Sequence, residues 1–145
     1  MKNILSAAAF AAIIAFPGVA GAQDLPQSVT GLGLTDIQVR ERANAEPRHV
    51  RGTLPSGTRV KVDLDRNGEI EEIEARGNGL FPIGEIVSIV PQAVLDSPTW
   101  PADARLEQIE FKRGGRIEIE GRLADGREFE AEFSADGTVL EFERD

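Results

Sequence analysis

Polar and apolar residues alternate along the C-terminal third of the chain. Apolar residues or glycine occupy every second position in residues 117–123 and 129–133, and the positions between them hold Glu or Arg. A period of two sends successive side chains to opposite faces of a β-strand. Asp125-Gly126 and Asp136-Gly137 follow these runs and are typical of tight hairpin turns. The pattern predicts an antiparallel sheet with one apolar and one charged face.

A similar pattern occurs 69 residues earlier in the chain. Residues 52–74 align with residues 121–143 without a gap, and six of the 23 positions are identical. Each copy is preceded by a Pro-Gln pair, in residues 25–29 and in residues 90–94. This self-similarity indicates one supersecondary unit present twice. A chance similarity between two β-hairpins is the alternative interpretation, because short strands look alike.

Proline is favourable in the first turn of a helix, so each unit is expected to begin with a short helix. That helix is the cover available for the apolar face of the sheet. The predicted fold class is α+β, with two tandem repeats, each a short helix (or helix pair) packed on a small antiparallel β-sheet. Residues 23–76 form the first predicted repeat, residues 77–81 a linker and residues 82–145 the second repeat. In the last unit, pairing Leu123 with Phe129 would place Arg122 opposite Glu130.

The second unit resembles the PepSY-like domains, which share the fold of the β-lactamase inhibitor protein. The resemblance rests on an opening segment, a strand, a hairpin and an ending, namely residues 90–94, 115–120, 125–129 and 136–141. The first unit matches more weakly. The resemblance implies an exported protein of tandem helix-on-sheet units, and some such proteins are thought to bind or inhibit enzymes. The chain departs from an inhibitor-type interface rich in tyrosine, because it contains no Tyr and no Cys.

The N-terminal segment has the pattern of a signal peptide. Lys2 precedes an uncharged stretch from Ile4 to Phe16, and small residues at Ala20 and Ala22 form a cleavage site. The apolar stretch is too short to span a bilayer, which takes about 20 residues. Residues 1–22 are therefore predicted to be cleaved, so that the protein is periplasmic or secreted and is not inserted in the membrane afterwards.

Charge and composition restrict the possible partners. The chain has 25 acidic and 16 basic residues, for a net charge of −9. Nucleic acids and anionic membranes bind cationic surfaces, so the composition excludes a nucleic-acid partner and favours solubility or a basic partner. Without cysteine the chain has neither disulfides nor thiolate chemistry.

One segment satisfies the calcium-loop template of the EF-hand. The candidate ligands in residues 63–74 are Asp63, Asp65, Asn67, Glu69 (through its carbonyl) and Glu74. Residues 58–64 alternate as a strand, however, and the second copy of the turn lacks the ligand pattern. A hairpin explains both copies and would place Leu64 opposite Glu71, Asp63 opposite Glu72 and Lys61 opposite Glu74. Calcium stays open as the alternative, and no other cofactor is expected.

Few residues indicate chemistry of another kind. His49 is the only histidine, and the alignment places it on the charged face of its strand, where a solvated side chain is expected. The sequence contains no evident nucleophile–base set, so the protein is not expected to be an enzyme. Trp100, between Pro98 and Pro101, is either a loop aromatic that covers the core or a partner-binding residue.

These observations predict an exported periplasmic binding module without catalytic activity, which resembles PepSY-like or inhibitor-like proteins. Its predicted partner is another protein of the cell envelope, which it binds or regulates. A calcium-binding periplasmic protein that uses residues 63–74 is the alternative.

Overall fold

The structure is a computed structural model of the chain, and it describes residues 25–40 and 48–145. The predicted signal peptide, residues 1–22, lies outside the described residues. Within the described part, no helix combines the length and the apolar character that a membrane span requires.

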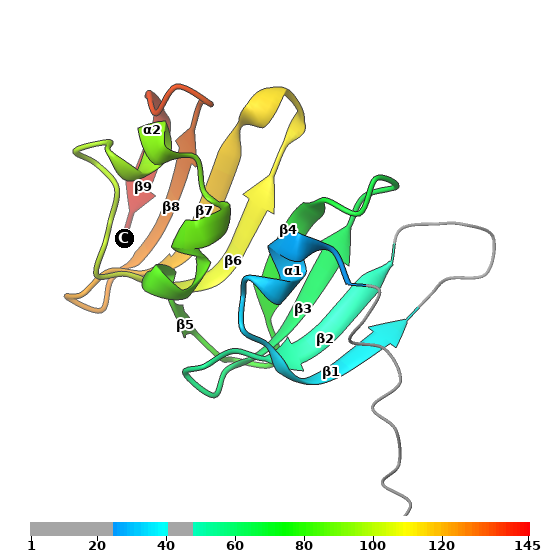
Figure 1. Cartoon of the computed structure of the whole chain (residues 1–145). Helices are drawn as coiled ribbons and strands as arrows, with labels where there is room; N and C mark the ends of the chain where they lie inside the picture. Colours follow the sequence, from blue (N-terminus) through cyan, green and yellow to red (C-terminus); the bar gives the residue numbers. More distant parts are fainter. Residues whose placement is uncertain (1–24, 41–47) are drawn as a thin grey trace, which may run out of the picture.

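The described chain forms one antiparallel sheet of nine strands (Figure 1). Eight of them lie in the order β1-β2-β3-β4-β6-β7-β8-β9, and β5 pairs with β6. The strands are β1 (Thr35–Arg40), β2 (His49–Thr53), β3 (Arg59–Leu64), β4 (Ile70–Ala75), β5 (Phe81–Pro82), β6 (Arg105–Phe111), β7 (Ile117–Arg122), β8 (Glu128–Phe133) and β9 (Val139–Arg144). The strands predicted from alternation are all present, with their apolar positions buried and their charged positions on the other face.

The predicted α+β class is wrong, because the protein is mainly β. Its α-helices α1 (Gln27–Thr30) and α2 (Gln92–Leu95) have four residues each, and Ile83–Ile89 is a 3-10 helix, η1. Helices do form at both predicted places, but Pro26 and Pro91 are the N-cap residues rather than part of the first turn, and each helix ends after about one turn. Two separate helix-on-sheet units do not form, because β4 pairs with β6 and joins both halves into one sheet. The predicted linker, residues 77–81, ends in Phe81, which is buried and pairs with Leu106.

Two hairpin registers differ from those predicted. Asp63 and Lys61 do lie opposite Glu72 and Glu74, but an irregularity after Asp63 places Leu64 opposite Ile70 rather than Glu71. In the next hairpin Arg122 lies opposite Glu128 rather than Glu130. That turn closes with a hydrogen bond from the Leu123 N–H to the Arg127 carbonyl, around a glycine with φ +87°. A glycine in this conformation makes a three-residue loop, which shifts the expected pairing.

The two halves of the sheet use the same pairing pattern. Lys61 pairs with Glu74, and the residues 69 positions later, Glu130 and Glu143, also pair. The correspondence includes the helices, since the Val29 N–H and the Val94 N–H donate at 3.0 Å to the carbonyls of the preceding prolines. The two halves therefore share the same hydrogen-bonding pattern. That they are two copies of one unit stays a prediction.

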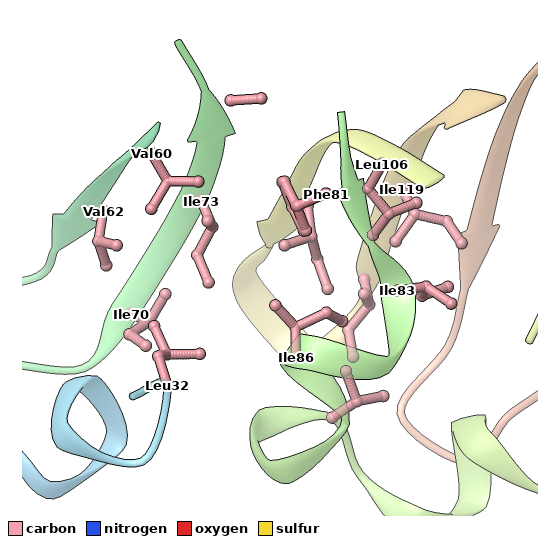
Figure 2. Close-up of a cluster of buried hydrophobic side chains, with 14 of the residues drawn as sticks. Leu32, Val60, Val62, Ile70, Ile73, Phe81, Ile83, Ile86, Leu106 and Ile119 are labelled. Atoms are coloured by element: carbon pink, nitrogen blue, oxygen red, sulfur yellow. The ribbon is translucent and has the colours of Figure 1, made fainter. Parts of the chain in front are cut away.

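The core lies between the sheet and the short helices, which share one face of it (Figure 1). In the first half Val60, Val62 and Ile73 of the sheet lie near Leu32, which follows α1 (Figure 2). In the second half Phe81, Leu106 and Ile119 lie near Ile83 and Ile86 of η1 (Figure 2). No polar or charged residue of the described part is buried. The opposite face of the sheet is therefore the place to look for polar chemistry.

Candidate functional site

The polar face of the sheet, meaning the face opposite the short helices, carries its charges in rows across the strands. One row crosses five neighbouring strands from β4 to β9 and consists of Glu72, Glu110, Glu118, Glu132 and Glu141. A second row on β7, β8 and β9 consists of Glu120, Glu130 and Glu143. Neighbouring strands are about 4.8 Å apart, so these carboxylates repel one another. We call these eight residues the glutamate rows.

The other half of the polar face is richer in basic residues. Arg51 lies opposite Lys61, and Arg40 lies opposite His49, in strands β1 to β3. The face is thus polarised, with positive charge toward the β1 edge and negative charge toward the β9 edge. The alternation within each strand does not predict this separation of positive and negative charge, because the separation arises from the order of the strands in the sheet.

Ion pairs neutralise part of the glutamate rows. Lys112 binds Glu118 and lies 3.8 Å from Glu132, and Arg116 binds Glu132 at 2.7 Å. The other members on β6 to β9, namely Glu110, Glu120, Glu130, Glu141 and Glu143, form no ion pair with any described residue. The middle of the polar face is therefore a surface of unneutralised negative charge.

Three of these carboxylates converge. One carboxylate oxygen from each of Glu118, Glu120 and Glu130 lies within 4.8 Å of the other two. Burial raises the pKa of Glu120, and the charges of Glu130 and Glu118 raise it further. Burial likewise raises the pKa of Glu72, against the attraction of Lys61. Ionising these groups therefore costs the folded protein stability.

Replacing Glu120 by Gln is expected to stabilise the protein at neutral pH. The folded-state pKa is raised, so the penalty appears as pH rises above the ordinary value of 4.5 and is absent well below it. Cross-strand charge pairs contribute about 0.2 to 1 kcal/mol, which sets the size of the expected gain at pH 7. Urea denaturation of both proteins at pH 7 and near pH 3 measures this difference.

Glu69→Gln is the control for this substitution, because Glu69 is exposed in the β3–β4 turn, outside the rows. It should leave stability nearly unchanged at both pH values. A loss of stability in Glu120→Gln at pH 7 would show that repulsion does not dominate at this position.

The candidate calcium ligands are divided between two hydrogen-bonded groups. Asp65 Oδ1 accepts hydrogen bonds from the backbone N–H groups of Asn67 and Glu69, each at 2.8 Å, and so holds the turn. Asp63 and Glu74 instead bind Lys61 Nζ, at 2.9 and 3.3 Å. The segment is the predicted hairpin, and the candidate ligand carboxylates of Asp63, Asp65 and Glu74 already have partners within the protein.

The two remaining candidate residues belong to different parts of the fold. His49 is half-buried on β2, opposite Asp63 on the polar face. Trp100 is half-buried and packs on Phe133, with ring centroids 5.7 Å apart at an angle of 59°. Phe133 belongs to the core, so Trp100 lies against the helix-covered side and not on the polar face.

Comparisons with known proteins found no matching family model and no matching curated protein. Among solved structures, a protein of unknown function from Bacteroides vulgatus, described as a candidate periplasmic protein, is 19% identical with a TM-score of 0.49. That match covers 86% of this chain and 95% of the other. Another candidate periplasmic protein, from Bacteroides eggerthii, is 13% identical with a TM-score of 0.35, over 83% and 88% of the two chains.

A third similar structure is described as a BLIP-like protein from Bacteroides fragilis. It is 15% identical with a TM-score of 0.35, and the match covers 86% of this chain and 89% of the other. All three TM-scores are below 0.5, so we base the functional interpretation on this chain's own residues.

Proposed function

We propose that the protein is an exported periplasmic binding module without catalytic activity, built from two PepSY-like units, which docks on another envelope protein through its polar face. The N-terminal segment supports the compartment. The single histidine and the lack of cysteine support a role without catalysis.

The observation that carries the proposal is the glutamate rows. Glu120, Glu130 and Glu143 form no ion pair with any described residue, although Glu130 lies directly opposite both of the others. Like charges directly opposite each other destabilise a sheet. A cationic surface on a partner removes this repulsion on binding, and it also speeds association through long-range attraction. The partner is therefore a protein with a basic surface.

The test compares two double variants with the same net charge. Glu120→Gln/Glu130→Gln removes two charges from the glutamate rows. Asp103→Asn/Glu69→Gln removes two exposed charges outside them. An oligolysine peptide serves as the probe and is titrated against each protein by calorimetry at low and physiological salt. The row variant is expected to bind about tenfold more weakly than the wild type, with the control within about twofold.

Equal weakening in both variants would mean that the peptide senses only net charge, and the docking surface would be rejected. Unchanged binding in both would reject it as well. Because removing the row charges is expected to stabilise the fold, loss of binding cannot be attributed to unfolding.

A further inference from the structure

The basic half of the polar face contains a pocket of about 380 Å³. Three arginines from neighbouring strands line it, Arg51 on β2, Arg59 on β3 and Arg76 directly after β4. The backbone brings them together, since Arg51 and Arg59 lie opposite Lys61 and Thr53 in adjacent strands. The Arg76 N–H donates to the Arg59 carbonyl at 2.8 Å.

These three arginines have no carboxylate partner in the described part of the chain. The acidic groups closest to them along the strands, Asp63 and Glu74, bind Lys61 instead. Asp36 is the only acidic residue among those lining the pocket, and it forms no ion pair with them. The pocket therefore keeps an excess of positive charge in a chain whose net charge is −9.

The Nε atom of Arg51 provides a second, independent observation. This atom is buried and has no hydrogen-bond partner among the residues that the structure describes. A buried N–H of a charged group without an acceptor is costly, and native proteins leave few such groups unsatisfied. A ligand in the pocket would satisfy it once the Arg51 side chain turns to expose the Nε–H.

We propose that Arg51, Arg59 and Arg76 form a binding site for an oxyanion. The planar guanidinium group presents its N–H donors in a fork that fits the oxygens of phosphate, sulfate or carboxylate. The oxyanion accepts hydrogen bonds from the exposed guanidinium groups of Arg59 and Arg76 and offsets the repulsion among the three arginines. Its charge draws the Arg51 side chain toward the pocket, where the Nε–H gains an acceptor. Gln38 and Thr53, which also line the pocket, supply further polar groups. Arg51 and Arg76 also line a neighbouring pocket with Glu72 and Glu110 of the glutamate rows. The docking test changes Glu120 and Glu130, which do not line either pocket, so either proposal can fail without the other.

The experiment titrates the protein with phosphate, sulfate and acetate at constant ionic strength set with chloride. Two-dimensional NMR of the arginine Nε–H groups follows the Arg51 resonance, and calorimetry gives the affinities. Phosphate or sulfate should shift the Arg51 Nε–H resonance in a saturable way. A stronger response to acetate would identify the ligand as a carboxylate instead of a tetrahedral anion.

Arg59→Gln and Arg76→Gln test the site, because both side chains are exposed and their replacement leaves the core intact. Each is expected to weaken anion binding about tenfold. Arg66→Gln, in the exposed β3–β4 turn, removes the same charge outside the pocket and should leave the affinity within about twofold. Arg51→Lys retains the charge but lacks Nε, and it should weaken binding too.

Equal affinities in the wild type and all these variants would overturn the proposal. So would an Arg51 Nε–H resonance that none of the three anions shifts. Equal weakening by Arg66→Gln would reduce the effect to general electrostatic attraction and would also reject the site.

Discussion

Replacing Gly137 by Ala is expected to lower the free energy of unfolding by more than about 3 kcal/mol. Gly137 lies in the β8–β9 turn with φ +86°, a backbone conformation that residues other than glycine rarely adopt. An added Cβ would lie 2.0 Å from the carbonyl oxygen of Ala93 and 2.7 Å from its carbon. Both atoms are backbone of α2, so the clash can be relieved only by moving the helix away from the turn.

The turn itself also resists relaxation. The Asp136 carboxylate accepts hydrogen bonds from the Ser134 hydroxyl and from the Thr138 N–H, which lower the pKa of Asp136 to about 2. These bonds hold the backbone on both sides of Gly137. The added methyl group must therefore displace α2 from the sheet, which exposes part of the core.

Gly126→Ala is a matched control for the Gly137 substitution. Gly126 lies in the β7–β8 turn with φ +87°, and an added Cβ there would meet no atom within 4 Å. It should cost only the backbone penalty of the left-handed conformation, about 1 to 2 kcal/mol. Urea denaturation of both variants gives the comparison, and equal losses would show that α2 does not pack against the β8–β9 turn.

Replacing Ile109 by Ala is expected to destabilise the protein by about 2 to 5 kcal/mol, since it leaves a cavity in the core. Ile109 is fully buried in the middle of β6, opposite Ile73 on one side and Ile119 on the other. It therefore contacts both halves of the sheet across the β4–β6 junction. The variant should still unfold in one cooperative transition, at a lower urea concentration than the wild type, because both halves share this core.

Two probes check whether the transition is single. Fluorescence of Trp100, which packs on Phe133, reports on the second half, while far-ultraviolet circular dichroism reports on the whole sheet. Their midpoints should coincide in the wild type and in Ile109→Ala. Leu140→Ala, at a side chain that is 51% exposed on β9, should cost less than about 1 kcal/mol. Separate transitions would mean that the halves fold independently.

The members of the candidate site could be recognised from sequence, but their arrangement could not. Alternation places Glu118, Glu120 and Glu130 on the charged side of their strands, and such a face is expected to be solvated. The convergence of the three carboxylates depends on strand register, and the register of this hairpin differs from the predicted one because of the three-residue turn. The arginine pocket depends on the pairing of three strands in the first half. Sequence reasoning missed it, because no local motif links Arg51, Arg59 and Arg76.

The sequence did not predict β1, and it assigned Phe81 of β5 to a linker. It did determine the turns and the alternating strands of the aligned segments, residues 52–74 and 121–143, and which face of these strands is apolar. These are local properties, because a period of two and a glycine in a turn act over a few residues. It also determined that helices begin directly after Pro26 and Pro91. Only the tertiary structure decided that these helices stop after a single turn and that β4 pairs with β6 to make one sheet. Any strand edge offers the same backbone N–H and carbonyl groups, so which edges pair depends on how the whole core closes. That pairing, in turn, extends one of the glutamate rows from the second half to Glu72 on β4 and leaves the arginines at the other end of the same face.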